Sequence, residues 1–310
     1  MKISYSPYQL NFQRGSLARI GALLRVDFNG GLVGYADCHP WPELGDEPLK
    51  EQLHLINNGK NSPLIRSALE SAYLDAEARA QKKSLVDQKA VPRSHFLGLN
   101  LLEWTAEDSK RVQLEGFTHL KFKVGKQLER EIEQLYRFKD ATLKIRLDFN
   151  LCMTCESFTA FLKRIEALQE KIDFIEDPFP FDPAKWEAIQ KEGWPLACDR
   201  EVSLAIGLSA SARYLIIKPA MTEERGQAAK GQIKIVTSYL GHPLEQVFAA
   251  YVAAQLDPEK KQLHGLLSHR VFAPTSFSKQ LNWQGAAFKT PSGTGWGFDE
   301  ELAALDWMDG

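Results

Sequence analysis

The chain has 310 residues, of which 44% are hydrophobic and 25% charged, with a formal net charge of −2 at pH 7. These values are typical of a soluble globular protein and give no reason to expect nucleic acid or a membrane as a partner. No stretch approaches the roughly 20 apolar residues of a membrane span, and residues 1–14 lack a signal-peptide core. The four cysteines are too few and too unevenly placed for a disulfide framework, so we expect a cytoplasmic protein.

The first ninety residues combine a hairpin with helices. Strands are predicted at 23–29 and 32–37, joined by Asn29-Gly30-Gly31, because Asn-Gly favours the positive φ of a tight hairpin turn. A helix is predicted over 63–82, where apolar residues recur at spacings of three and four. We therefore predict a separate α+β unit over residues 1–92.

From residue 93 onward, predicted strands alternate with helices. The strands are expected near 95–102, 119–124, 143–149, 172–177, 196–199, 214–218 and 233–238, with a further candidate at 263–268, and the helices at 105–115, 128–139, 155–170, 183–192 and 243–256. This alternation indicates βαβ units and a parallel sheet, in which seven or eight strands suffice for a (β/α) barrel of the TIM type. We predict the barrel over 93–275, with an open doubly wound sheet as the alternative. Residues 276–310 lack the pattern and are expected to return towards the N-terminal unit.

Five successive strands of the predicted barrel end in a charged residue. In chain order these residues are Lys123, Asp148, Glu176, Asp199 and Lys218. A charge at the end of one buried strand is ordinary, but the active site of a (β/α) barrel lies where the carboxyl ends of the strands meet. The pattern therefore predicts one site built from all five.

The three carboxylates of this set predict a metal site. Asp148, Glu176 and Asp199 lie about one βα unit apart, so their side chains would converge and repel one another. A hard divalent cation removes the repulsion, and an all-oxygen ligand set suits Mg²⁺. The alternative is that each carboxylate is a helix N-cap or a solvated strand end.

The lysines predict proton transfer. Burial at a strand end lowers the pKa of a lysine, so Lys123 or Lys218 could serve as a base. Alternatively, Lys218 is only an ion-pair partner of Asp199. Lys121 shares a strand face with Lys123, because side chains alternate along a strand, and either supports the site or depresses the pKa of Lys123.

Together these motifs resemble the enolase superfamily. The resemblance lies in Lys121-x-Lys123, Arg146-x-Asp148-x-Asn150, Glu176-Asp177-Pro178, Asp199 and Lys218, and it extends to Arg19-Ile20-Gly21, to the helix at 67–75 and to Val236-Thr237-Ser238. A lysine on both the second and the sixth barrel strand is similar to the muconate-lactonizing subgroup. The Arg-x-Asp-x-Asn pattern, the short N-terminal half and the short total length look most like the o-succinylbenzoate synthases within it.

The resemblance implies a barrel covered by an N-terminal capping domain, with the activity of a Mg²⁺-dependent lyase. Its substrate would be a small carboxylate, 2-succinyl-6-hydroxy-2,4-cyclohexadiene-1-carboxylate, dehydrated to o-succinylbenzoate in menaquinone biosynthesis. Lys123 would remove the α-proton and then assist departure of hydroxide, while Lys218 stays a cation. The resemblance further implies that Thr237 and Ser238 contact the succinyl group, and that Lys121, Arg146 and Asn150 support the site or bind substrate.

Two departures from the family pattern stand out. Arg200 follows Asp199 directly, where the family commonly has Glu, and Leu240-Gly241-His242 replaces the usual Leu-Glu-Ser. The loop at 39–45 lies where the family has its specificity loop, and is either a substrate lid or a Pro-rich connection.

The same residues leave two other functions open. An N-acylamino acid racemase or dipeptide epimerase would use both lysines as acid and base on opposite faces of the substrate. An alternative of another class is a non-catalytic ligand-binding barrel. The sequence leaves the oligomeric state open.

Overall fold

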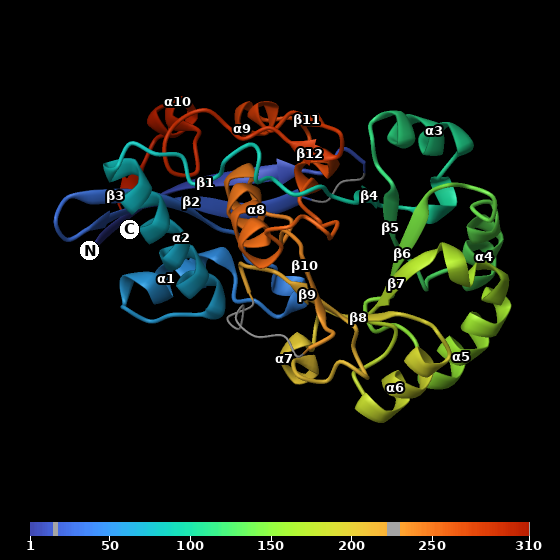
Figure 1. Ribbon diagram of the computed structural model, residues 1–310. Coiled ribbons are helices and arrows are strands. Elements are labelled where there is room, and N and C mark those ends of the chain that lie inside the picture. The colour runs from blue at the N-terminus through green and yellow to red at the C-terminus, as the bar shows by residue number, and fades with distance from the viewer. Residues whose placement is uncertain (15–17, 222–229, 310) are drawn as a thin grey trace.

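The computed structural model describes residues 1–14, 18–221 and 230–309. Figure 1 shows an antiparallel sheet and two helices beside a curled parallel sheet, with helices along the outer side of the parallel sheet. The (β/α) barrel and its N-terminal α+β cap, predicted from the sequence, are confirmed. None of the described helices combines the length and the apolar character needed to cross a membrane.

The cap is built on a four-stranded antiparallel sheet. Its strands, in spatial order, are β13 (Met308–Asp309), β1 (Lys2–Asn11), β2 (Ala18–Phe28) and β3 (Leu32–Cys38). The predicted hairpin joins β2 to β3, and Gly30 and Gly31 adopt the positive φ values of 96° and 81° that the turn requires. Strand β1 was not predicted, although it pairs with β2 along its whole length.

Two helices cover one face of this sheet. They are α1 (Leu49–Asn57) and α2 (Pro63–Ala80). The Ser62 side chain accepts a hydrogen bond from Ile65 N and so caps the start of α2. The first residue of the helix is Pro63, which is favourable at this position. Gly34 of β3 allows α2 to approach closely, because a Cβ there would lie 1.9 Å from Ala72 O.

Within the described residues, the barrel sheet contains seven parallel strands. In order of the chain these are β4 (Phe96–Gly98), β5 (His119–Lys123), β6 (Lys144–Asp148), β7 (Ile172–Glu176), β8 (Leu196–Cys198), β9 (Tyr214–Ile217) and β10 (Ile233–Val236). In the sheet register, Lys123 lies opposite Asp148 and Asp148 opposite Glu176. The strand ends that were predicted to meet are therefore neighbours.

A short segment closes the ring between β10 and β4. Isolated bridges join Thr237 to Gly265 and Ser94 to His264. Main-chain hydrogen bonds flank both bridges, from Ser238 N to Gly265 O at 3.0 Å and from His95 N to His264 O at 2.8 Å. The candidate strand at 263–268 is thus reduced to two bridging residues, which nevertheless complete the barrel.

Among the described residues, the barrel helices match the five predicted ones and include one more, the short α7, which was not predicted. They are α3 (Ala106–Leu114), α4 (Leu128–Tyr136), α5 (Cys155–Arg164), α6 (Pro183–Lys191), α7 (Val202–Ala205) and α8 (Pro243–Leu256). The predicted helix at 155–170 is divided, because a 3₁₀ segment, Glu166–Lys171, follows α5. Helix α8 is buried along most of its length and lies between the cap and the barrel in Figure 1.

The C-terminal segment runs back over the cap. It contains α9 (Ser276–Gln280), β11 (Trp283–Gln284), β12 (Ala287–Phe288) and α10 (Asp299–Ala303) before β13. Trp296 attaches it to α2, since its backbone N donates to Asp75 Oδ1 at 2.6 Å and its indole N–H to Ser71 O at 3.1 Å. On this arrangement we propose the division into 1–92, 93–275 and 276–310.

Candidate active site

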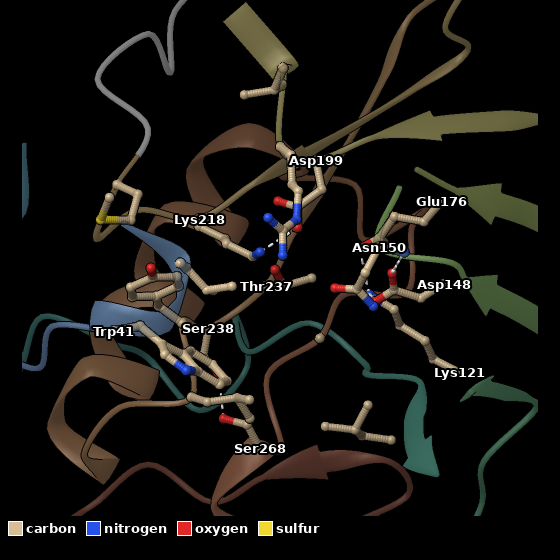
Figure 2. A pocket seen from close by; sticks show the side chains of 18 of the residues that line it. Trp41, Lys121, Asp148, Asn150, Glu176, Asp199, Lys218, Thr237, Ser238 and Ser268 are labelled. Carbon is tan, nitrogen blue, oxygen red and sulfur yellow. Dashed lines mark hydrogen bonds and ion pairs between the residues drawn. The ribbon is translucent and has the colours of Figure 1, made fainter. Parts of the chain in front are cut away.

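A cavity of about 590 Å³ opens at the carboxyl ends of the barrel strands (Figure 2). The predicted site residues that line it are Lys121, Lys123, Asp148, Asn150, Glu176, Asp199, Lys218, Thr237 and Ser238. Trp41 and Leu44 of the cap also line it. The structure therefore brings together every predicted site residue except Arg146.

Lys121 lies between two of the carboxylates (Figure 2). Its Nζ is 2.7 Å from Glu176 Oε1 and 3.1 Å from Asp148 Oδ2, and its side chain is buried. Although burial opposes the charge, Asp148 and Glu176 raise the pKa of Lys121 well above its ordinary value. Lys121 is thus a fixed ammonium that neutralises only part of the negative charge around it.

Glu176 retains unsatisfied hydrogen-bonding capacity. Its side chain is 1% exposed, and its Oε2 atom has no hydrogen-bond partner in the part of the chain that the structure describes. Burial raises the pKa of Glu176 to about 8; Asp148 and Asp199 add to this rise, while Lys121 opposes it. The Lys121 ammonium alone therefore does not offset the burial of this carboxylate and the two carboxylates beside it.

Asp199 forms an ion pair with Lys218, as Figure 2 shows. This is the contact that the sequence left open as an alternative for Lys218. Burial opposes the charge of Lys218, but Asp199 and Glu176 outweigh it and raise its pKa. The Lys218 ammonium also lies 5.7 Å from the centre of the Tyr239 ring.

Asp177 positions the third carboxylate. Its two oxygens accept hydrogen bonds from Asp199 N at 2.9 Å and from Arg200 N at 3.0 Å. Asp177 has a positive φ of 45°, a strained conformation for a residue other than glycine. Its role was not predicted, although Glu176-Asp177-Pro178 was part of the recognised motif.

Lys123 differs from the other two lysines because it is exposed to the cavity and no described carboxylate forms an ion pair with it. The cavity walls partly desolvate the ammonium and so lower the pKa of Lys123, Asp148 opposes the shift, and Lys121 and Lys218 add to it. Lys121 thus supplies part of the depression that the sequence suggested. A lysine with a lowered pKa is suited to accept a proton.

The donor set fits a hard divalent cation. Three carboxylates from neighbouring strands face one cavity, and the orphaned Glu176 Oε2 shows that the lysines do not satisfy them fully. Oxygen-only ligands suit Mg²⁺. In the structure, the lysine ammonium groups lie against the carboxylates. Among the described residues, no three His, Cys, Asp or Glu side chains are then close enough together to hold an ion.

Arg19 ties the cap loop to the barrel. Its guanidinium donates to Pro40 O and His39 O in the cap, at 3.1 and 3.0 Å, and to Tyr239 O and Leu240 O after β10, at 3.3 and 3.2 Å. It also lies 4.1 Å from the centre of the Trp41 ring, which lines the cavity. The loop predicted at 39–45 is therefore part of the cavity wall.

The structure explains the glycine that departs from the family pattern. A Cβ at Gly241 would lie 2.6 Å from the His39 ring and 2.7 Å from Asp37 Oδ2. Asp37 already accepts hydrogen bonds from His242 N at 2.8 Å and from Tyr8 OH at 2.7 Å. A carboxylate from the cap thus fills the space where a larger residue at 241 would lie. Arg200, the other departure, lines the cavity.

Arg146 occupies a different place from the other predicted residues. Its guanidinium donates to Asp173 Oδ2 and to Leu263 O, both at 2.7 Å, and lies 2.9 Å from His95 Nδ1. It therefore supports the barrel beneath the cavity and does not line it. His95 and Ser268, whose hydroxyl hydrogen-bonds that of Ser238, do line the cavity but were not predicted. His95 begins a predicted strand and does not end one, and Ser268 ends a segment that was only a candidate strand.

Comparisons with known proteins agree with this geometry. Residues 3–78 match the family model described as O-succinylbenzoate synthase, N-terminal domain, and residues 104–209 match the one described as Enolase C-terminal domain-like. An o-succinylbenzoate synthase of Bdellovibrio bacteriovorus is 35% identical to the chain, over 99% of the chain and 98% of the relative. The chain belongs to the o-succinylbenzoate synthase family.

More distant relatives of the chain are consistent with this family. An o-succinylbenzoate synthase of Thermosynechococcus vestitus is 25% identical over 86% of the chain and 82% of the relative. Muconate lactonizing enzyme from Pseudomonas putida shares the fold, with a TM-score of 0.77 and 16% identity over 98% of both chains. The L-Ala-D/L-Glu epimerase from Bacillus subtilis does so with a TM-score of 0.73 and 17% identity, over 96% of this chain and 98% of the other. Membership of the enolase superfamily, predicted from the motifs, is confirmed.

Proposed function

We propose that the protein is an o-succinylbenzoate synthase, a lyase that dehydrates 2-succinyl-6-hydroxy-2,4-cyclohexadiene-1-carboxylate to o-succinylbenzoate. The observation that carries the proposal is the end-to-end match to a relative of that name, combined with two lysines and three carboxylates around one cavity. The small carboxylate substrate belongs to menaquinone biosynthesis, and the four free cysteines support a cytoplasmic location.

Asp148, Glu176 and Asp199 would hold Mg²⁺ in this enzyme. Members of the enolase superfamily generally use Mg²⁺, and the donor set is the oxygen-only one that this ion prefers. When bound, the ion would supply positive charge for the substrate carboxylate as the α-proton leaves. Lys121 would keep Asp148 and Glu176 in place through its two ion pairs.

Lys123 acts as the base in this proposal. Its lowered pKa leaves more of the neutral amine available, and Nζ takes the α-proton of the substrate carboxylate. The C–H electron pair then forms the new ring double bond as the C–O bond breaks. The proton on Lys123 leaves with the hydroxide as water, so that one base serves both halves of a syn elimination. The charge of Lys218 stabilises the negative charge that develops on the substrate.

A product assay with the cyclohexadiene substrate tests the proposal. Formation of o-succinylbenzoate that stops with chelator and resumes with Mg²⁺ is the expected result. The same lysines would suit an N-acylamino acid racemase, so N-succinyl amino acids should be assayed in deuterated water beside it. Racemisation with exchange of the α-proton, without turnover of the cyclohexadiene, would overturn the dehydration in favour of the racemase. Binding without any proton exchange would favour a non-catalytic barrel.

A further inference from the structure

The wall of the cavity contains a histidine that the proposed reaction does not use. His95 directly precedes β4, is 4% exposed and lines the cavity. Its backbone N donates to His264 O at 2.8 Å, at the seam where the barrel closes. This hydrogen bond fixes the backbone of residue 95 at the cavity wall.

Arg146 determines which nitrogen of the His95 ring carries hydrogen. A guanidinium can only donate, so the 2.9 Å contact requires His95 Nδ1 to be the acceptor, and the hydrogen of the neutral ring is on Nε2. Burial, with Arg146 and Lys121 nearby, lowers the pKa of His95 well below its ordinary value, so the ring is neutral. Arg146 is itself held by Asp173.

The Nε2–H group of His95 is a donor without a partner among the described residues. Within the described chain, no hydrogen bond joins it to another side chain or to the main chain, and Nε2 is not fully buried. Because the ring lines the cavity, a ligand can reach this hydrogen.

A second unpartnered polar group lies beside it. Thr237 Oγ1 is buried and has no hydrogen-bond partner in the described chain, and because the residue lines the cavity, rotation of its side chain would present the hydroxyl to a ligand. Gly265 separates the two side chains: a Cβ there would lie 2.7 Å from Thr237 Cγ2 and 3.0 Å from His95 Cε1. Only glycine fits between these two side chains, so both lie against residue 265 and both line the cavity.

We propose that His95 Nε2–H and the Thr237 hydroxyl bind one oxygen of the succinyl side chain of the substrate. The inference rests on the proposed function, and makes His95 a specificity-determining residue that does not touch the reacting atoms. Both groups can donate to an oxygen acceptor. Ketone and carboxylate oxygens share this chemistry.

Matched ligands test the proposal independently of turnover. Titration calorimetry with Mg²⁺ present would measure binding of o-succinylbenzoate, of 2-butanoylbenzoate, which keeps the ketone, and of 2-butylbenzoate, which has no side-chain oxygen.

His95→Leu should weaken the binding of o-succinylbenzoate about 10- to 100-fold, the effect of losing one buried hydrogen bond, and leave the binding of 2-butylbenzoate unchanged. His95→Gln, which can accept from Arg146 and still donate, should restore most of the affinity. A loss shared by 2-butanoylbenzoate identifies the ketone as the bound oxygen, and a loss confined to o-succinylbenzoate identifies the carboxylate.

His119→Leu is the matched control. His119 lies 3.8 Å from Asp173 Oδ2, the carboxylate that holds Arg146, but does not line the cavity, so its loss should leave all three affinities unchanged. Thr237→Val removes a hydroxyl that has no partner among the described residues, so the variant should fold normally and bind o-succinylbenzoate several-fold more weakly. This variant decides the question should His95→Leu fail to fold.

Two results would overturn the inference. One is equal weakening of o-succinylbenzoate and 2-butylbenzoate by His95→Leu, and the other is unchanged binding of both in His95→Leu and Thr237→Val. A wild-type protein that binds o-succinylbenzoate through His95 but does not turn over the cyclohexadiene contradicts the proposed function alone. A wild type that catalyses dehydration while His95→Leu binds normally contradicts the further inference alone. Failure of the wild type to bind o-succinylbenzoate would count against both.

Discussion

Two buried carboxylates in this molecule have opposite environments. Asp37, between cap and barrel, receives hydrogen bonds from Tyr8 OH and His242 N and lies 2.9 Å from His39 Nδ1. Burial would raise its pKa, but His39, His242 and Tyr8 outweigh it and lower the pKa of Asp37. Glu176, in the cavity, keeps an unpartnered oxygen, and its pKa is raised to about 8.

The difference separates a structural charge from one available to a ligand. A buried charge stabilises a fold only when its partners compensate for the loss of water. Asp37 meets that condition, so it holds cap and barrel together. Glu176 does not meet it, so its environment is complete only with further positive charge. Variants in the cavity should therefore reduce activity more than stability, and variants at the cap–barrel contact the reverse.

The strongest test of the comparison is Lys123→Ala. Loss of the proposed base should reduce dehydration by about 10⁴-fold, the upper range for general base catalysis, and abolish exchange of the α-proton. The free energy of unfolding should change little, because Lys123 is exposed to the cavity. Turnover, deuterium exchange and urea denaturation measure the three quantities. Retained exchange at one face of an N-succinyl amino acid would point to Lys218 as a second base.

Glu176→Gln tests the metal site through two quantities, activity and Mg²⁺ affinity. Losing an anionic ligand should lower activity and Mg²⁺ affinity by about 100-fold or more, since even indirect support of a ligand is worth 10- to 100-fold. Chelated enzyme should regain activity on addition of Mg²⁺. Full activity of a demonstrably metal-free wild type would refute the metal assignment.

The same variant should change the pH dependence of stability. The folded pKa of Glu176 is raised from 4.5 to about 8, so its stabilising contribution is complete below pH 4.5 and is lost as the pH rises through 8. Metal-free wild type should therefore lose stability across this window, and Glu176→Gln should lose less. Added Mg²⁺ should restore the wild type, by about 2.7 kcal/mol at 100 times its Kd. Identical pH profiles for the two metal-free proteins would contradict this account.

The sequence could predict the cavity because strand periodicity and strand order determine where each strand end lies. Lys123, Asp148 and Glu176 each end a regular apolar strand, and the parallel register then makes them neighbours. Arg146 has the same strand face as Asp148 and lies in register with Lys121, which lines the cavity, but its guanidinium binds Asp173 and Leu263 O instead. Periodicity alone does not show how far up a barrel the cavity extends.

What the sequence could not predict depends on partners distant in the chain. His95 reaches the cavity because the main chain of residue 264 binds it across the barrel seam, and no local pattern encodes that pairing. Strand β1 was missed although it is paired along its whole length. The reason for Gly241 lies in Asp37 and His39, some two hundred residues away along the chain.

Arg19→Met tests the cap–barrel side of the comparison. It removes a guanidinium that donates to four carbonyl groups, so we expect a loss of about 3 kcal/mol in the free energy of unfolding, as for buried acceptors left unpaired. KM should rise more than kcat falls, because Trp41 loses the group that holds it at the cavity. Arg25→Met on the same strand, which removes only an i,i+2 pair with Asp27, is the control and should cost no more than about 0.5 kcal/mol. Equal effects of both variants would show that Arg19 has no special role.

The smallest expected effect is that of Gly241→Ala. The added Cβ would lie within 2.6 Å of the His39 ring and 2.7 Å of Asp37 Oδ2, so we expect a loss of about 1–3 kcal/mol in stability, typical of overpacking. Gly241→Glu, which restores the residue usual in the family, should lose more stability, because a second carboxylate would meet Asp37.

His39→Ala removes one of the two groups that a Cβ at 241 would meet, so Gly241→Ala should lose less stability in that background than in the wild type. A double-mutant cycle in urea would measure this difference. If the cycle shows no coupling, His39 is not what requires glycine at 241. Kinetic constants should change little in Gly241→Ala, since the strain lies at the contact that holds the cap and not among the cavity carboxylates.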